Sequence, residues 1–195
     1  MLFIFILISL VHFVSSNIQD QEMIIAFHNE LRSITAFHAK AANMHQLRWD
    51  TFLSLSATIF AEDHRWNVSR DEKLEGFTVF HSNSLLSDSK MTEQDYFNRY
   101  LQSQMFDWSP WCLTEDMLDS MADLMQMLWA KSSKIGCHTE RWVDPATGNH
   151  TIQVCKYDRP VQLNAPIYKQ GEPCSKCPRD TFRNFTSGLC VTPSP

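Results

Sequence analysis

The chain has 195 residues, of which 44% are hydrophobic, a share that supports a packed core and excludes an intrinsically disordered chain. Its formal net charge is −5, so a broad basic surface for nucleic acid or anionic lipid is not expected. The length is sufficient for one ordinary domain with short appendages.

The chain begins with an apolar run, Met1–Ser16, that ends in small residues, as a secretory signal peptide does. Cleavage before Asn17 places Val14 and Ser16 where the signal peptidase requires small or apolar residues. The alternative is an uncleaved anchor, but the run is shorter than the roughly 20 apolar residues that a membrane span needs. No later run reaches that length. We therefore predict a secreted, extracellular protein with no transmembrane segment after cleavage.

Two further features agree with export from the cell. Sequons of the type Asn-X-Ser/Thr at Asn67, Asn149 and Asn184 predict a glycoprotein. The number of cysteines is even, at six, and predicts three disulfides in an oxidising compartment. The spacing of the cysteines alone does not choose among the many pairings that six allow.

The first half of the mature chain shows helical periodicity. A helix is predicted over Ile18–Phe37, with Glu30 and Arg32 pointing away from its apolar face. A second helix is predicted over Trp49–Asp63, and Asp50 near its start suits the positive end of the helix dipole. The predicted buried stripe of this second helix comprises Phe52, Leu53, Ser56, Ile59 and Phe60.

The middle of the chain contains irregular and helical segments. Residues 67–91 are predicted to be polar and irregular, apart from a short strand at Phe77–Phe80. Thr92 begins a third predicted helix, which has acidic residues in its first turn and ends near Met105. A fourth helix begins at Thr114. Its wide apolar face is formed by Met117, Leu118, Met121, Leu124, Met125, Leu128 and Trp129.

Two strands follow the fourth helix. The first contains Ile135-Gly136-Cys137, and the second, Ile152–Tyr157, alternates with the period of a half-buried strand. The polar stretch Asp144–Asn149 is the predicted hairpin loop between them. A disulfide between neighbouring strands would hold such a pair together in a secreted protein. Prolines after Tyr157 enforce an extended path towards Cys190, and the order of the elements predicts an α+β fold.

Five short motifs occur in the order in which one known family has them. They are His28–Arg32 (HNELR), Ala42–Asp50, Gln126–Cys137, Val154–Tyr157 (VCKY), and the cysteine-bearing stretch from Tyr168 to Cys190. Together they resemble the CAP superfamily of cysteine-rich secretory, antigen 5 and pathogenesis-related proteins, and in particular its animal venom-allergen-like members. The resemblance implies a three-layer α-β-α sandwich. After the signal peptide at 1–16, it implies a CAP (SCP) domain at 17–157 and an extended, hinge-like tail at 158–195.

The resemblance also implies particular disulfides. It pairs Cys137 with Cys155, and Cys177 with Cys190, which leaves Cys112 and Cys174 as the third pair. Cys174 and Cys177 form a CxxC motif, which elsewhere is redox-active or binds zinc. In a chain that carries signals for export, we interpret both cysteines as structural.

Many CAP proteins carry two histidines and two glutamates around a central cleft, and these residues can hold a divalent metal. In this chain Asp123 stands where the family has a histidine, and Glu75 matches a glutamate only with a one-residue shift. No tight ligand spacing supports a rebuilt site, so we predict a degenerate cleft with no metal and no cofactor. The family's other glutamate falls near Asn98 or Arg99, and its other histidine falls near Val68. His64 and His81 are the two histidines considered as substitute ligands.

An aromatic-rich segment precedes the fourth helix. The aromatic residues of Tyr96–Tyr100 fit one helical face and are expected to close the helix layer over the sheet. Phe106, Trp108 and Trp111 lie near Pro110 in a predicted loop. We identify these three as a candidate apolar surface for a lipid or a protein partner.

No pattern predicts catalysis. The chain has no GxSxG motif, no phosphate-binding glycine-rich loop and no paired carboxylates at a telling spacing. We therefore predict a non-enzymatic binding protein that carries a sterol or fatty acid, as some CAP proteins do. The alternative is a ligand for an extracellular protein partner, in immune-modulatory or reproductive signalling, with loops such as 67–91 as the recognition surface. A hydrolase is a remote alternative.

Overall fold

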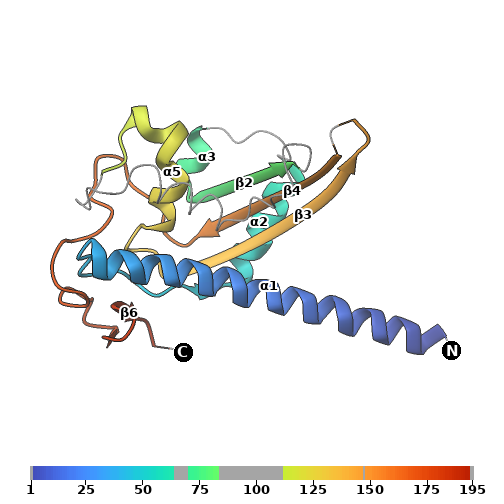
Figure 1. Ribbon diagram of the computed structural model, residues 1–195, viewed down its shortest axis with the longest axis horizontal. Coiled ribbons are helices and arrows are strands. Elements are labelled where there is room, and N and C mark those ends of the chain that lie inside the picture. The colour runs from blue at the N-terminus through green and yellow to red at the C-terminus, as the bar shows by residue number, and fades with distance from the viewer. Residues whose placement is uncertain (1, 64–69, 84–111, 147, 194–195) are drawn as a thin grey trace.

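The computed structural model describes residues 2–63, 70–83, 112–146 and 148–193, which form helices around a mixed sheet (Figure 1). The elements in chain order are α1 (Leu2–His38), β1 (Arg48–Trp49), α2 (Thr51–Asp63), α3 (Arg70–Leu74), β2 (Phe77–Asn83), the 3-10 helix η2 (Glu115–Met117), α5 (Leu118–Met127), β3 (Lys134–Asp144), β4 (Gly148–Tyr157), β5 (Phe182–Asn184) and β6 (Leu189–Val191).

The main sheet has the strand order β1-β3-β4-β2. Strands β3 and β4 form the predicted hairpin, β2 pairs antiparallel with β4, and β1 pairs parallel with β3. Helix α2 covers one face of this sheet, and α1 and α5 lie over the other (Figure 1). This arrangement confirms the α+β prediction and the three-layer α-β-α sandwich.

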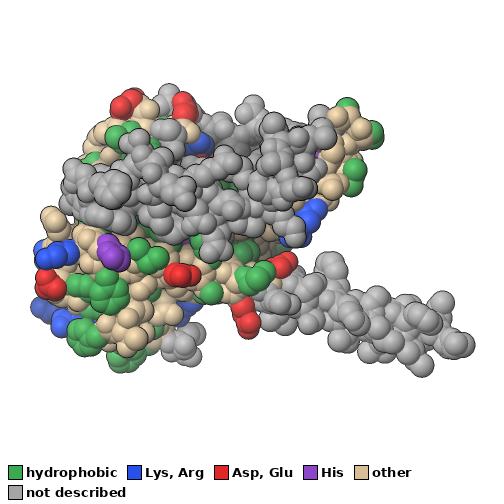
Figure 2. Space-filling model, viewed as in Figure 1, with side chains coloured by type: hydrophobic (Ala, Val, Ile, Leu, Met, Phe, Trp, Pro, Cys, Tyr) green, Lys and Arg blue, Asp and Glu red, His purple; other side chains and the backbone are tan. Residues whose placement is uncertain are grey.

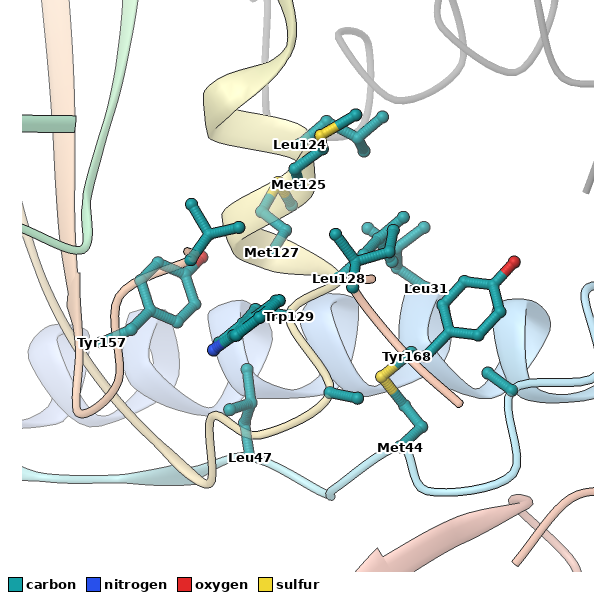
Figure 3. Packing of buried hydrophobic residues seen from close by; sticks show 14 of the residues in the cluster. Leu31, Met44, Leu47, Leu124, Met125, Met127, Leu128, Trp129, Tyr157 and Tyr168 are labelled. Carbon is teal, nitrogen blue, oxygen red and sulfur yellow. The ribbon is translucent and has the colours of Figure 1, made fainter. Parts of the chain in front are cut away.

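Apolar side chains pack on both faces of the sheet. The smaller cluster joins α2 to β2 and β4 through Ala57, Phe60, Phe77, Ile152 and Val154. The larger cluster joins α1, α5, β3, β4 and the C-terminal tail. Figure 3 shows Trp129 at the centre of this larger cluster, between the end of α5 and Tyr157. The other residues labelled there are Leu31, Met44, Leu47, Leu124, Met125, Met127, Leu128 and Tyr168.

Helix α1 contains the predicted helix Ile18–Phe37, but one prediction about its faces is wrong. Arg32 was expected to point away from the core, and its side chain is fully buried. The guanidinium donates from Nη1 to the carbonyl of Met127 (2.6 Å) and from Nε to that of His45 (2.7 Å). It also donates from Nη2 to the carbonyls of Trp129 (3.1 Å) and Ser132 (3.0 Å). Arg32 is buried because these carbonyls satisfy its donors.

His28, one turn before Arg32, is also fully buried. Its Nδ1 donates to the carbonyl of Ile24 (2.8 Å), so its Nε2 accepts from the hydroxyl of Tyr157 (2.8 Å) in the neutral ring. Burial, and to a smaller extent the charge of Arg32, lower the pKa of His28 to about 4, although the hydrogen bond to Ile24 acts in the opposite direction. The histidine is therefore an uncharged link between α1 and the end of β4.

The start of α2 is fixed against β3. Asp50 Oδ1 accepts from the backbone N–H groups of Phe52 (3.0 Å) and Leu53 (3.2 Å), so it caps the helix. The sequence had placed Asp50 near the positive end of a helix that began at Trp49, and α2 begins at Thr51. A Cβ built on Gly136 of β3 would stand 2.0 Å from the backbone nitrogen of Ser54. Only glycine therefore allows the helix to lie this close to the strand.

The predicted buried stripe of α2 is partly wrong. Its side chains are buried at Phe60, as predicted, and at Ala57 and Ala61. Phe52 and Ile59 are exposed instead, by 84% and 53%. The face of α2 that approaches the sheet near Gly136 thus carries Ala57, Phe60 and Ala61, whereas Phe52 and Ile59 lie on the outer side.

Other predictions on the middle of the chain are corrected or lie outside the described residues. The short helix α3 replaces part of the segment predicted to be irregular, and β2 extends beyond the predicted strand Phe77–Phe80. The fourth predicted helix corresponds to η2 and α5 and ends at Met127, so Leu128 and Trp129 are buried just after it. The predicted third helix, Thr92–Met105, lies outside the described residues.

The tail returns to the body of the molecule. Ala130 donates its backbone N–H to Ile167 (2.8 Å), and Ala42 donates to Lys169 (2.7 Å). The side chains of Ile167, Tyr168 and Leu189 belong to the larger core cluster. The tail therefore contributes to the same core as α1 and α5, and it ends in the hairpin β5–β6, which the expectation of an extended path did not include.

Two of the three predicted disulfides are present. Cys137 bonds to Cys155 across β3 and β4, and Cys177 bonds to Cys190. The third pair is wrong, because both Cys112 and Cys174 are free thiols. Cys112 is held beside Pro166 by a backbone bridge. The buried Cys174 thiol instead donates to the carbonyls of Asn184 (3.6 Å) and Leu189 (3.5 Å), and burial raises its pKa.

Replacing Arg32 by Met should destabilise the fold by about 3–5 kcal/mol, because several buried carbonyls lose their donors together. The measurement is urea unfolding at neutral pH. The matched control is Arg48→Met, which removes one exposed bond to the carbonyl of Pro193 and should cost within about 0.5 kcal/mol. Equal costs for the two variants would contradict the role assigned to Arg32.

Candidate functional site

The candidate apolar surface predicted from the sequence, Phe106, Trp108 and Trp111, lies outside the described residues. The sterol or fatty-acid site therefore stays a prediction. Asn67, with its sequon, and His64 also lie outside the described residues. The described residues do place Asp123, the predicted cleft position, together with its surroundings.

Asp123 lies on α5, where this helix faces β2 and the short helix α3 (Figure 1). Its Oδ2 is 3.7 Å from Nζ of Lys73, and each of the two side chains is only 16% exposed. Its Oδ1 accepts from the backbone N–H of Val79, in β2, at 3.3 Å. One carboxylate thus connects α5 to both α3 and β2.

Lys73 makes further contacts that hold its ammonium at this position. Nζ also donates to the carbonyls of Leu118 (3.5 Å) and Asp119 (3.4 Å), at the start of α5. Burial raises the pKa of Asp123, and Lys73 and the N–H of Val79 oppose that rise by stabilising the carboxylate. The pair is therefore a partly buried ion pair, with hydrogen bonds on both sides.

This arrangement does not fit a divalent metal. The partner of Asp123 is a lysine ammonium, which carries the charge of a cation and cannot serve as a ligand while protonated. The side chain of Glu75 is exposed. Within the described ranges, no three His, Cys, Asp or Glu residues form a group that could hold a metal ion. Lys73 was missed in the sequence because α3 is too short to show periodicity.

Two of the three predicted sequons lie on the described surface. Asn149 is exposed at the start of β4, beside the hairpin turn, and Asn184 is exposed at the end of β5. Both asparagines are therefore accessible to modification.

A second surface feature is an apolar face on α2. Phe52, Leu55 and Ile59 are exposed by 84%, 57% and 53%, and their spacing places them on one side of the helix. Large apolar side chains grouped on a surface mark sites of interaction. The sequence periodicity of α2 was interpreted as a core stripe and so concealed this face.

Comparison with known proteins identifies the family. The sequence pattern of CAP, the cysteine-rich secretory protein family, matches residues 25–157. The chain belongs to this family. The matched region runs from α1 to the last residue of β4, so it includes Arg32, Asp123 and the disulfide between Cys137 and Cys155.

Among similar proteins is a cysteine-rich venom protein of Tityus serrulatus, 28% identical over 191 residues. The alignment covers 90% of this chain and 47% of that protein, so this CAP chain spans about half of the relative's length. The solved structure of BmVAL-1 is similar with a TM-score of 0.66 and 26% identity, covering 90% of this chain and 95% of that one. A hookworm platelet inhibitor shares the fold, with a TM-score of 0.69, 19% identity and coverage of 89% and 91%.

The described residues include no helix with both the length and the apolar character needed to cross a bilayer.

Replacing Lys73 by Met should destabilise the protein by about 2–4 kcal/mol at neutral pH, because it leaves the Asp123 carboxylate buried without its cation. The cost should fall as the pH is lowered, since the pKa of Asp123 is already raised and rises further without Lys73. Protonation of Asp123 in the folded state then removes the buried charge. Urea unfolding of the variant and the wild type at each pH measures the difference.

The matched control for this experiment is the double variant Lys73→Met, Asp123→Asn. It carries no buried charge and should be more stable at neutral pH than Lys73→Met alone. The wild type should unfold at the same urea concentration with added Zn²⁺ and with a chelator. A higher midpoint in Zn²⁺ that Asp123→Asn abolishes would show that the position binds metal after all.

Proposed function

We propose that this CAP protein is secreted and acts outside the cell by binding a ligand, without catalysing a reaction. Membership of a family described as secretory and the apolar leader at Met1–Ser16 support secretion. The ion pair of Lys73 and Asp123 supports binding over catalysis, because the Asp123 carboxylate, at the cleft position, already binds a lysine of the same chain. No catalytic motif occurs elsewhere in the sequence.

The proposed ligand is a sterol or a fatty acid, bound by Phe106, Trp108 and Trp111. The observation that carries this proposal is the concentration of large aromatic residues around Pro110, which suits an apolar ligand surface. The segment leads directly into Cys112 and Leu113, which pair with Pro166 and Leu163 of the tail. The two described residues that follow this segment are therefore held to the tail.

A second candidate function is that of an interaction ligand for an extracellular protein. The exposed apolar face of α2, formed by Phe52, Leu55 and Ile59, favours it, because interface cores are enriched in such side chains. Helix α2 lies on the other side of the sheet from α5, the helix that carries Asp123 (Figure 1). The two functions therefore depend on different residues, and separate substitutions distinguish them.

Lipid binding should weaken by about tenfold or more in the double variant Trp108→Ala, Trp111→Ala, since truncating an aromatic anchor in an apolar site commonly costs over 1 kcal/mol. Titration of the delipidated protein with a fluorescent sterol and a fluorescent fatty acid measures the change. The matched control is Phe52→Ser, Ile59→Ser on α2, which should leave both affinities unchanged. Circular dichroism should show that both variants keep the fold.

Equal lipid affinities in the wild type and the tryptophan variant would overturn the proposed site. Weakened lipid binding in the α2 variant alone would move the site to α2. A protein that binds no lipid in either titration, but binds a partner that the α2 variant loses, would favour the interaction ligand.

A further inference from the structure

The sequon at Asn184 differs from the other two in the residue that stands two positions before the asparagine. That residue is Phe182, whereas an arginine and a threonine stand before Asn67 and Asn149. The full motif is Phe182-Arg183-Asn184-Phe185-Thr186, with the acceptor threonine in place. This sequon alone therefore combines an aromatic ring and an acceptor asparagine at a spacing of two.

The structure places this motif on a strand. Phe182 and Asn184 are the first and last residues of β5, which pairs antiparallel with β6 so that Phe182 opposes Val191 and Asn184 opposes Leu189. Side chains two residues apart on a strand project from the same face, about 7 Å apart. Phe182 is 66% exposed, and Asn184 is also exposed. The ring and the amide therefore share one open face.

The asparagine amide is oriented by the turn that follows. Its Oδ1 accepts from the backbone N–H groups of Thr186 (3.1 Å) and Ser187 (3.3 Å). These bonds use the oxygen and not Nδ2, the nitrogen to which a glycan attaches. The bonded oxygen limits rotation of the amide, so Nδ2 keeps one direction relative to the strand.

The hairpin that carries the motif is held firmly to the body. Its far strand contains Cys190, which is bonded to Cys177, and the Cys174 thiol binds the carbonyl of Asn184 beneath it. At the turn, Gly188 has a φ of +70°, and a Cβ there would lie 3.1 Å from the Cβ of Ala36 in α1. The face that bears Phe182 is thus a fixed surface on the protein.

We propose that Asn184 carries an N-linked glycan and that the ring of Phe182 is a binding platform for its first sugar. The axial C–H bonds of a pyranose form an apolar face with partial positive charge, which suits the electron-rich face of an aromatic ring. The linkage forms when Nδ2, losing one proton, displaces the lipid diphosphate from the anomeric carbon of a lipid-linked oligosaccharide. The inference goes beyond the proposed function and shares with it only passage through the secretory pathway.

Contact with the sugar would also change the surface of the tail. Hydrophobic side chains gather over the C-terminal tail, at the lower left of the view in Figure 2. Among the described residues, Phe182 and Phe185 are two of the most exposed large apolar side chains, at 66% and 70%. A glycan seated on Phe182 removes apolar area from water and links the sugar to the hairpin, so it stabilises the folded state.

The experiment compares four proteins secreted from eukaryotic cells: the full wild-type chain, Thr186→Val, Phe182→Thr and the double variant. Thr186→Val abolishes the sequon but keeps Asn184 and the backbone N–H that orients it. If the native leader does not export the protein, a standard leader replaces it. A failure of the secretion proposal then does not prevent the test of Asn184. Glycopeptide mass spectrometry should find Asn184 occupied in the wild type and empty in Thr186→Val.

Thermal unfolding should show that Thr186→Val lowers the Tm by about 2–4 °C in the wild-type background and has no such effect in the Phe182→Thr background. The control Phe185→Thr should leave the full effect in place, because residue 185 does not share the strand face of Asn184. NMR of the glycosylated protein should show contacts between the Phe182 ring and protons of the first sugar. An unoccupied Asn184, or an equal loss of Tm in both backgrounds, would overturn the proposal.

Discussion

The buried guanidinium of Arg32 fixes α1 to the connection between α5 and β3. The chain leaves α5 at Met127 and enters β3 at Lys134, and the carbonyls of this connection point into the core, where they need donors. Arg32 supplies them from α1. Asn29, on the same helix, binds both backbone groups of Leu47, and Gln126 receives the N–H of Val161. The family's motif residues thus bind backbone and fix three separate segments around one core.

Much of this fold could be predicted from the sequence, because these elements are determined by residues that are neighbours in the chain. The hairpin of β3 and β4 follows from period-2 alternation and a polar turn, and Asp50 lies at the start of α2 as its position indicated. The position of Arg32 could not be predicted, since periodicity assigns a charged residue to the surface and cannot register the carbonyls that surround it. The outer face of α2 was missed because Gly136, distant in sequence, sets which side of the helix approaches the sheet.

The candidate site, too, could be predicted from the sequence only in part. Asp123 could be identified from its place in the family's pattern, but its ion pair with Lys73 is a tertiary contact with a helix of only five residues. The third disulfide was assigned only from the two cysteines left over, and the structure has both Cys112 and Cys174 as free thiols. The family model and the scaffold coincide over residues 25–157, and the features on which the proposals rest lie on three elements: α5 with Asp123, the outer face of α2 and the strand that carries Asn184.

We propose that this CAP scaffold binds an apolar ligand. The most direct test is native mass spectrometry of the protein secreted from eukaryotic cells, with a domain of similar size secreted in parallel as a control for adventitious lipid. A sterol or fatty acid should be bound near one to one in this protein and absent from the control. A protein that is empty as isolated, and stays empty when titrated with sterols and fatty acids, would contradict it.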